Sequence, residues 1–428
     1  MLANKRAKSY VCIDLKSFYA SVECVDRGLD PFTENLVVAD PTRGSGTICL
    51  AITPAMKALG VKNRCRIFQI PNGIEYTMAT PRMARYMEVS AQINALYLRY
   101  VSTEDIHVYS IDECFIDATP YLKLYRMSAK AFAEMLRNKV AEETGITATA
   151  GIGPNLFLAK VALDIEAKKA ADGIGILDEE SYKREIWFHR PITDIWQVGP
   201  GIAHRLAKHG IHDMAGVCAA NPAWLKKEFG KNGEYLLDHA WGQEPCTIKQ
   251  IKEYRPAAHS ISNGQVLMRD YSFSEARTVL REMADASCLD LCSKGLSCGN
   301  VSVHVGYAQP HLTESGRWDM GSGGSTKLSE RTDSSHRIVK VALELFDKHT
   351  LNSEPIRRLT VALGALQPTK YDQPSLFSSE DDGKEANLAK ASIAVRDRFG
   401  KNALLRGTSL KQGATMRERN NQIGGHRA

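Results

Sequence analysis

The stretch YSIDECFID, Tyr109–Asp117, places Asp112 and Glu113 side by side inside an otherwise apolar run. Neighbouring residues of a strand point to opposite faces, so one continuous strand would drive one of these carboxylates into the core. We therefore predict a hairpin, with strands at Ile106–Tyr109 and Cys114–Ile116 and a turn at Ser110–Glu113. Both carboxylates can then meet at the tip, where a divalent cation could hold them. A solvated acidic turn is the alternative that this fragment leaves open.

The composition limits the class of protein. A chain of 428 residues is too long for one ordinary core, so two to four domains are expected. A hydrophobic fraction of 43% and a charged fraction of 24% are typical of a soluble globular protein. The formal net charge of +6 permits an anionic partner without requiring one. No apolar run is long enough to span a bilayer, and the N-terminal MLANKRAKSY lacks the apolar core of a signal peptide, so we expect a cytoplasmic protein without a membrane partner.

The ten cysteines form no CxxC pair. They are predicted to be reduced thiols of the core rather than a disulfide framework. The closest group, Cys288, Cys292 and Cys298, has poor spacing for zinc.

The first part of the chain mixes strands with helices and predicts an α+β domain. A strand ends at Asp14, and a helix opens near Ser17, which is a plausible cap. Further helices are predicted at Met83–Tyr100, at Ala129–Thr144 and over NLFLAKVALDIEAKKAA, the last one after a strand in TATAGIG. The segment GIGPNL lacks the third glycine and the downstream acidic residue of a dinucleotide site, so we reject a nicotinamide function.

The sequence pattern changes at about Tyr182, from where it predicts short helices that follow one another without a strand. Gly199-Pro200-Gly201 interrupts them and is interpreted as a turn whose free N–H groups can face a phosphate; an ordinary turn between helices is the alternative. Beyond Trp241 the pattern predicts a βαββαβ unit. Its elements are strands at His259–Leu267 and Asn300–Tyr307, a Gly- and Ser-rich hairpin DMGSGGSTKL followed by a strand, a last strand at Arg357–Leu366, and helices at Ser274–Lys294 and Ser335–His349. From Gln367 we expect a linker or tail with one helix near Leu388–Phe399.

Asp14 ends one strand, and Asp112 and Glu113 lie at a hairpin about a hundred residues later. Carboxylates at the ends of neighbouring strands can share two divalent ions, which stabilise the attacking and leaving oxygens of a phosphoryl displacement. Mg²⁺ suits such a site because it takes oxygen ligands and completes its shell with phosphates and water. The pattern favours nucleotidyl transfer.

These motifs resemble a known family. IDLKSFYASVE and YSIDECFID look like the two metal-binding motifs of the Y-family translesion DNA polymerases, VGPGIAHRL resembles their helix-hairpin-helix thumb, and the βαββαβ unit resembles their little finger. The segment RFGKNALLRGTSL is similar to the C-terminal region of the bacterial UmuC-like branch. The resemblance covers about the first 366 residues. It implies an α+β multidomain right hand with a palm (1–18 and 82–180), fingers (19–81), a thumb (181–246), a little finger (254–366) and a C-terminal tail (367–428).

The resemblance also implies roles for single residues around the metals. Asp14, Asp112 and Glu113, with the backbone carbonyl of Leu15, would hold two Mg²⁺ ions. Tyr19 matches the steric gate that excludes a ribose 2′-hydroxyl, and Phe18 lies beside it under the sugar.

Other positions would contact the incoming deoxynucleoside triphosphate and the nascent base pair. Lys57 and Lys168 match the residues that grip the triphosphate, with Lys160 as the alternative to Lys168 because the spacing is one residue longer than in some relatives. Pro54 stands where many members have a tyrosine, so one phosphate contact is missing or is supplied by Thr53. Ile48 and Leu50 would cover the nascent base pair.

The implied function is low-fidelity, template-directed DNA synthesis across damaged DNA, as part of DNA repair and the SOS response. QPSLF, Gln373–Phe377, resembles the peptide by which bacterial polymerases bind the sliding clamp: Gln373 would bond at a pocket rim, and Leu376 and Phe377 would bury apolar surface. Primer-template DNA is the implied substrate. A UmuD-like protein and RecA are further implied partners, and the protein would act at the bacterial nucleoid. The alternatives are a palm-type nucleotide cyclase and a noncatalytic DNA- and clamp-binding protein.

Overall fold

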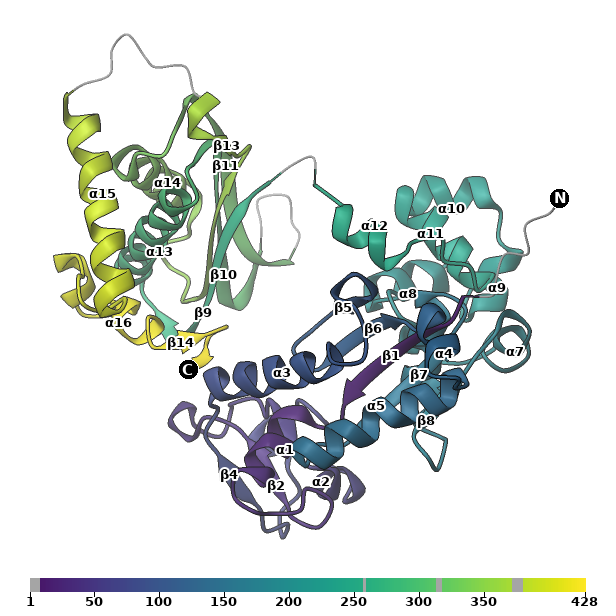
Figure 1. Ribbon diagram of the computed structural model, residues 1–428. Coiled ribbons are helices and arrows are strands. Elements are labelled where there is room, and N and C mark those ends of the chain that lie inside the picture. Colours follow the sequence, from purple (N-terminus) through teal and green to yellow (C-terminus); the bar gives the residue numbers. More distant parts are fainter. Residues whose placement is uncertain (1–7, 257–258, 313–317, 372–379) are drawn as a thin grey trace. The chain divides into compact units, whose positions relative to one another are not determined.

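The computed structural model describes residues 8–256, 259–312, 318–371 and 380–428 (Figure 1). The chain divides into two compact units, Met1–Tyr254 and Arg255–Ala428. Within the described ranges, no helix has the length and apolarity needed to cross a membrane.

The first unit is built on a five-stranded sheet with the strand order β5-β6-β1-β7-β8. The strands are β5 (Ile106–Val108), β6 (Glu113–Asp117), β1 (Tyr10–Leu15), β7 (Ala148–Gly153) and β8 (Ile174–Ile176). The central strand β1 is antiparallel to both of its neighbours, and its apolar residues are buried on both faces. The sheet is therefore covered by helices on each side, as the α+β prediction requires.

Side chains alternate along β1, so its even-numbered and odd-numbered residues lie on opposite faces of the sheet and contact different elements. Tyr10 and Cys12 pack with Phe115 and with Leu156 of α6 (Leu156–Val161). Asp14 has the same parity in the strand, so it lies on the α6 face of the sheet. The helices α3 (Met83–Tyr97) and α5 (Ala129–Thr144) contact each other, and α5 also packs on β1 and β7.

Two smaller groups of elements complete the first unit. The sheet β3-β2-β4 consists of β2 (Leu36–Val38), β3 (Ala51–Ile52) and β4 (Thr77–Ala79) and packs with α1 (Phe18–Val25) and α2 (Pro54–Ala58). The helix α4 (Thr119–Leu124) follows β6 in the chain. After β8 the chain is helical: the stretch from β8 to residue 254, all of it described, contains no strand, as predicted. The helices are α7 (Glu179–Glu185), α8 (Pro200–Ala207), α9 (Met214–Ala219), α10 (Pro222–Phe229), α11 (Lys231–Ala240) and α12 (Ile248–Glu253).

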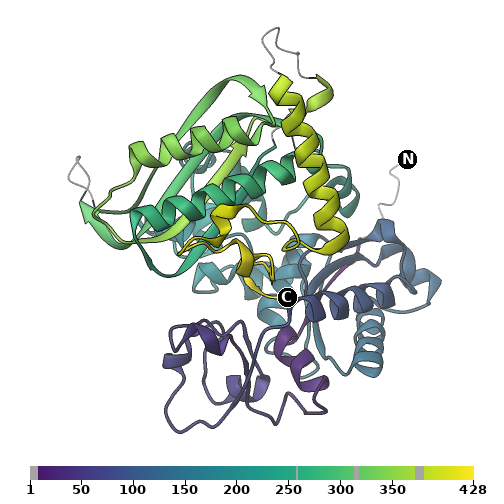
Figure 2. The same ribbon diagram turned by 90° about the vertical axis from the view of Figure 1, so that its left-hand side faces the viewer.

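The second unit has the predicted βαββαβ order. Its sheet, β11-β10-β12-β9, contains β9 (Ile261–Tyr271), β10 (Leu296–Leu312), β11 (Trp318–Thr332) and β12 (Ile356–Gly364), with the short strand β13 (Gln367–Pro368) paired to β10. The helices α13 (Phe273–Ser293) and α14 (Ser335–His349) cover one face, where Val301, Val303, Leu359 and Val361 are buried. Figures 1 and 2 show this sheet and the helix layer that covers it.

Three local predictions need correction. DMGSGGSTKL is not a hairpin: it lies within β11, because small residues are needed where Gly324 passes His349 of α14 and where Gly321 faces Gly306. The helix predicted over NLFLAKVALDIEAKKAA is α-helical only to Val161 and continues as a π-helical turn, Ala162–Glu166. Glu113 is the first residue of β6 rather than part of the turn, since it pairs with Asp14.

The chain after Gln367 is more structured than a linker with one helix. The predicted helix exists as α15 (Glu380–Phe399), and α16 (Met416–Arg419) and the strands β14 (Gln422–Ile423) and β15 (His426–Arg427) follow it. α15 and α16 both pack on α13, on the helix-covered side of the second unit (Figures 1 and 2). All ten cysteines are free, as predicted.

Candidate active site

The acidic residues of the two motifs come together at the ends of β1 and β6. Asp14 is the antiparallel register partner of Glu113, and the backbone N–H of Leu15 donates to the carbonyl of Asp112 at 2.9 Å. Directly opposed residues share a face of the sheet, so the Asp14 and Glu113 carboxylates lie on the α6 face together. Residues a hundred positions apart in the sequence are thus neighbours, which is the geometry that the motifs predict.

This arrangement concentrates negative charge. The pKa of Asp14 is raised from 3.8 to about 7 by burial and by the carboxylates of Glu113 and Asp112. Within the described ranges, no three carboxylate, histidine or cysteine groups converge as a ready-made metal cage. A magnesium ion does not require one, because it is held by one or two carboxylates and completes its shell with substrate phosphates and water. The donor set and the raised pKa of Asp14 therefore fit a divalent cation that arrives with its substrate.

Lys160 partly neutralises the site. Its ammonium is buried and lies 2.6 Å from Glu113 Oε1 and 2.7 Å from Asp164 Oδ1. These two contacts engage the ammonium, and they place it against the carboxylates rather than in a position open to a triphosphate. The alternative assignment of Lys160 as the phosphate ligand is therefore not favoured by the contacts.

Lys168 and Lys57 lie near each other although they belong to different parts of the first unit. The pKa of Lys57 is lowered by desolvation, raised by Asp14, and lowered by the nearby ammonium groups of Lys168 and Lys16. The π-helical turn Ala162–Glu166 precedes Lys168, and a π turn holds one residue more than an α turn. The longer spacing seen in the sequence is absorbed by this turn. Lys16 belongs to the same cationic group; it was not predicted, although it lies inside the motif IDLKSFYASVE.

The Tyr19 side chain packs against residues that are themselves held in place. It is half-buried in α1 and stacks on Tyr86 with ring centroids 4.5 Å apart. Tyr86 is fixed in turn, because its hydroxyl donates to the buried Glu23 carboxylate at 2.7 Å. Phe18 is buried beside Tyr19, with centroids 5.8 Å apart.

Tyr19 is also within electrostatic reach of the acidic site. Burial raises the pKa of Tyr19 most, and the Asp112 carboxylate raises it further. The Arg64 guanidinium lowers the pKa of the same hydroxyl. Arg64 is a second neighbour of the site that was not predicted from the sequence.

Thr53 cannot supply the phosphate contact that Pro54 lacks. Its side chain is fully buried, and its hydroxyl donates to the carbonyl of Glu34 at 2.8 Å. The same oxygen accepts the N–H groups of Leu36 and Met56, so it caps α2. Pro54 occupies the first helical position, where its missing N–H is harmless.

Ile48 is exposed, at 45% of its possible surface, and its backbone bridges to Arg66. Leu50 is half-buried. The exposed Ile48 side chain is available to contact a ligand, whereas the half-buried Leu50 side chain offers less surface for such a contact.

Gly199 is the N-cap of α8, and Gly201 lies in the first turn of this helix. A Cβ at either position would meet nothing within 4 Å. The N-terminus of α8 is thus open to a ligand. The segment Gln373–Phe377 lies outside the described residues.

The open face of the second sheet was not predicted. Residues opposite one another across β10, β11 and β12 share this face, and their side chains are small or polar: Ser302, His304, Gly306, Gly323, Ser325, Lys327, Arg358 and Thr360. A sheet covered on one side normally exposes such a face to solvent or to a ligand. Small side chains and backbone groups with added Lys, Arg and His are suited to a phosphate backbone. The alternation in VSVHVG and LTVALG is the signal from which it could have been found.

Comparison with known proteins gives two family matches. Residues 13–164 match the impB/mucB/samB family, and residues 258–376 match the C-terminal domain of the same family.

The curated relatives extend over the whole chain. "Putative UV-damage repair protein UvrX" of Bacillus subtilis is 30% identical over 98% of this chain and 98% of its own length. "DNA polymerase IV 2" of the same organism is 33% identical over 98% and 99%. Among solved structures, a Y-family DNA polymerase chimera superposes with a TM-score of 0.61 over 83% of this chain and 98% of its own, at 20% identity.

Proposed function

Because the chain belongs to the Y family of translesion DNA polymerases, we propose that Asp14, Asp112 and Glu113 hold the divalent cations of its reaction. The reaction is template-directed DNA synthesis across damaged DNA. The observation that carries the assignment is the register of β1 and β6, which sets Asp14 opposite Glu113. The relatives bear the names UvrX and DNA polymerase IV, so membership of the UmuC-like branch stays a prediction.

The cation that we propose is Mg²⁺, with two ions per site. Bound there, such ions supply Lewis-acid activation of the primer 3′-hydroxyl and neutralise the charge of the leaving pyrophosphate. The Leu15 carbonyl at the end of β1 is a further ligand in this proposal. The residues of the chain contribute by aligning Asp14 with Glu113 through the register of β1 and β6, and Lys160 holds Glu113 in place.

The deoxynucleoside triphosphate meets the cationic group of Lys57, Lys168 and Lys16. The pKa of Lys57 is lowered mainly by burial and further by the ammonium groups of Lys168 and Lys16, so an anion bound beside Lys57 would be stabilised by this positive charge. Tyr19, stacked on Tyr86, fills the place of a ribose 2′-hydroxyl in this proposal, with Phe18 packed under the sugar. Ile48 and Leu50 cover the nascent base pair.

DNA contacts come from two places in the proposal. The open polar face of the second sheet holds the phosphate backbone, and the N-terminus of α8, with Gly199 and Gly201, donates N–H groups to a further phosphate. Such contacts position the duplex without reading its sequence. A polymerase that works on damaged templates benefits from binding of this kind.

Partners beyond DNA rest on the sequence. The segment Gln373–Phe377 is proposed to bind the sliding clamp through Gln373, Leu376 and Phe377. A UmuD-like protein and RecA are the regulatory partners that membership of the UmuC-like branch would imply, with action at the bacterial nucleoid. Replacing Leu376 and Phe377 by alanine is expected to abolish clamp-stimulated synthesis while leaving synthesis without the clamp unchanged.

The test of the metal assignment is primer extension on undamaged and lesion-containing templates, with Mg²⁺ present or chelated. Asp112→Asn is expected to lower the extension rate at least a hundredfold while DNA binding is retained. Glu142→Gln, which removes an exposed carboxylate paired with Lys139 on α5, is the matched control and should extend primers normally. Normal extension by Asp112→Asn would refute the assignment. Formation of a cyclic nucleotide in place of extension would instead favour the cyclase alternative.

A further inference from the structure

The last 45 residues differ in charge from the rest of the chain. Residues Lys384–Ala428 contain ten Lys and Arg but three Asp and Glu, a formal charge of +7. Since the whole chain carries +6, the 383 residues before them sum to −1. The net positive charge of the protein is therefore concentrated in a segment that begins after both family matches end.

This segment is folded and is fastened to the second unit at two helix ends. Glu385 of α15 accepts hydrogen bonds from Ser334 Oγ at 2.7 Å and from the N–H of His336 at 2.8 Å, at the start of α14. Glu282 of α13 accepts the N–H groups of Thr415 and Met416, at 2.8 and 3.1 Å, at the start of α16. A carboxylate at a helix N-terminus satisfies free donors and interacts favourably with the helix dipole. The segment is thus a docked element with a fixed outer surface.

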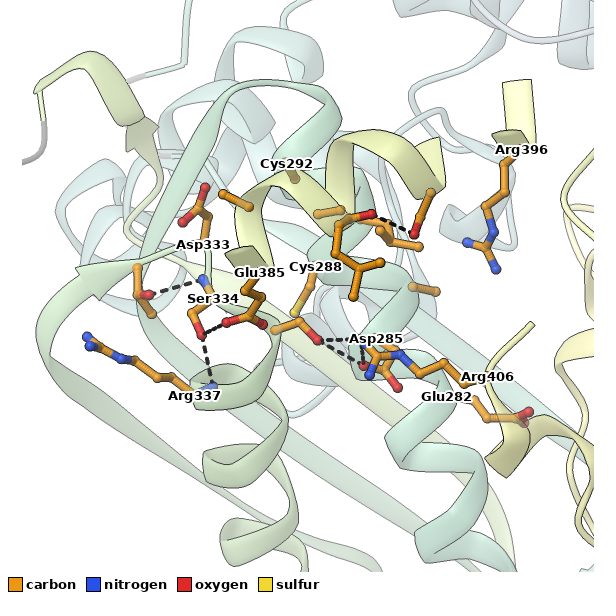
Figure 3. Close-up of a pocket in the computed structure, with 18 of the residues that line it drawn as sticks. Glu282, Asp285, Cys288, Cys292, Asp333, Ser334, Arg337, Glu385, Arg396 and Arg406 are labelled. Carbon is orange, nitrogen blue, oxygen red and sulfur yellow. Dashed lines mark hydrogen bonds and ion pairs between the residues drawn. The ribbon is translucent and has the colours of Figure 1, made fainter. Parts of the chain in front are cut away.

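Two arginines of the segment, Arg406 and Arg419, are bonded to other parts of the second unit, and a third, Arg396, lines a cavity. Arg406 lies 3.1 Å from Asp285 Oδ1 and donates to Ser335 Oγ at 2.9 Å, and Arg419 donates to Asn263 Oδ1 at 2.7 Å. Figure 3 shows Arg406 beside Asp285 and Glu385 beside Ser334, around a cavity of about 950 Å³ between α13 and α15. Asp285 and Glu385 thus hold the segment in place, and its outer surface carries two exposed carboxylates, Asp397 and Glu418, beside a larger number of cations.

Five outward-facing cations remain: Lys390, Arg398, Lys401, Lys411 and Arg417. All five are exposed, and within the described part of the chain none forms an ion pair with a carboxylate. The chain at Lys401 and the chain at Arg417 are held together, because Asn402 donates to the carbonyl of Arg417 at 3.1 Å and Asn420 to that of Lys401 at 3.2 Å. Exposed, unpaired cations on a fixed surface attract a polyanion and release their counterions when it binds.

The position of this surface separates it from the open sheet face. Within the second unit, α15 and α16 pack on α13, and α13 and α14 cover the other face of the sheet (Figure 1). The sheet therefore lies between the basic segment and the polar face of β10, β11 and β12. DNA that follows the polar face does not contact the basic segment unless it bends around the unit.

We propose that residues 384–428 form a second DNA-binding surface, which holds the phosphate backbone of a stretch of DNA other than the one on the open sheet face. Lys401 and Arg417 are its centre, with Lys390, Arg398 and Lys411 extending it. Binding through these side chains is independent of sequence, since phosphate contacts carry no base information. The surface raises the local concentration of DNA at the enzyme and is not part of the polymerase active site.

The experiment measures DNA binding by the full-length protein as a function of salt, using a single-stranded oligonucleotide and a blunt duplex in separate arms. The variant is Lys401→Glu with Arg417→Glu. The matched control is Lys340→Glu with Lys348→Glu, which makes the same change in net charge at exposed positions of α14. A second variant, Lys401→Gln with Arg417→Gln, and thermal unfolding of all proteins separate weakened binding from impaired folding.

We expect the first variant to bind DNA severalfold more weakly than the control. Its salt dependence should become shallower by about 0.9 for each phosphate that it no longer binds on a duplex, or by about 0.7 on a single strand. The arm that shows the change identifies the form of DNA that the surface holds. Single-nucleotide insertion at saturating primer-template should be unchanged. Equal affinities and equal salt slopes for variant and control in both arms would overturn the proposal.

Discussion

Replacing Asp14 by asparagine should make the metal-free protein more stable while it abolishes synthesis. The folded-state pKa of Asp14, about 7, lies above its ordinary value of 3.8, so the folded protein holds this proton more tightly than the unfolded chain does. Stability from this group therefore falls as pH rises from about 4 to about 7, and the whole penalty is present above pH 7. Asparagine keeps the size of the side chain and removes the charge that burial, Glu113 and Asp112 oppose.

The magnitude follows from the size of the shift. One pKa unit corresponds to about 1.4 kcal/mol, so a shift of roughly three units sets an upper bound of about 4 kcal/mol. Asp14 is partly exposed and is coupled to two other carboxylates, so we expect a gain of about 1–3 kcal/mol at pH 8. At pH 5, where Asp14 is mostly protonated in the folded state, most of this gain should disappear.

The assay is denaturant unfolding of the wild-type and Asp14→Asn proteins in EDTA at pH 5 and pH 8, followed by titration with Mg²⁺. Mg²⁺ should stabilise the wild-type protein at pH 8, because it binds the folded state and relieves the repulsion, and it should stabilise Asp14→Asn much less. A difference between the two proteins that is the same at both pH values would refute the reasoning. So would equal stabilisation of both by Mg²⁺.

Three further substitutions test the sugar gate, the packing of α6 on the central sheet and the role of Thr53. Tyr19→Ala should increase incorporation of ribonucleotides in primer extension while Tyr86→Phe, which keeps the stacked ring, should not; unchanged sugar discrimination in Tyr19→Ala would discard the gate assignment. Gly151→Ala should cost more than about 3 kcal/mol in denaturant unfolding, because its Cβ would lie 2.1 Å from the carbonyl oxygen of Ala159, whereas Gly201→Ala, in the first turn of α8 with nothing within 4 Å, should not lower stability. Thr53→Val should cost about 1–3 kcal/mol by leaving buried backbone groups unpaired, yet leave KM for the nucleotide unchanged; a large rise in KM would restore Thr53 as a phosphate contact.

The acidic hairpin was predictable from the sequence because its signal is local. An acidic pair inside an apolar run cannot lie in one buried strand, and that argument needs no knowledge of the rest of the chain. The meeting of Asp14 with the acidic pair was a different kind of inference, because it assumed that two segments a hundred residues apart form neighbouring strands. The sheet brings the segments together, but the register that sets Asp14 opposite Glu113 was not predicted, since Glu113 was placed in the turn.

The predictions that were wrong also have physical causes, because they concern segments whose structure depends on contacts with distant parts of the chain. Glycine and serine usually indicate a turn, so DMGSGGSTKL was interpreted as a hairpin, but a strand under a closely packed helix also needs residues without bulk. The docking of the tail depends on Glu282 and Glu385, whose partners lie 133 and 51 residues away. Composition cannot distinguish a docked basic segment from a solvated one, because the difference lies in these long-range contacts.

The two candidate lysines after β7, Lys160 and Lys168, show how contacts can favour one of two assignments that the spacing leaves open. If Lys160 turned toward a triphosphate, Asp164 would lose the ammonium 2.7 Å away, and Glu113 would lose it too unless a metal ion replaced it. Both carboxylates are half-buried, so loss of the ammonium would leave their charge less compensated, which is unfavourable. A move of Lys168 toward a triphosphate would break no such ion pair. Lys168 is exposed, lies near Lys57, and follows a π-helical turn that accommodates the one extra residue in the spacing before it. Lys160 of α6 thus lies against the carboxylates, and Lys168, in the turn after the π-helical segment, is the lysine that we propose for the phosphates.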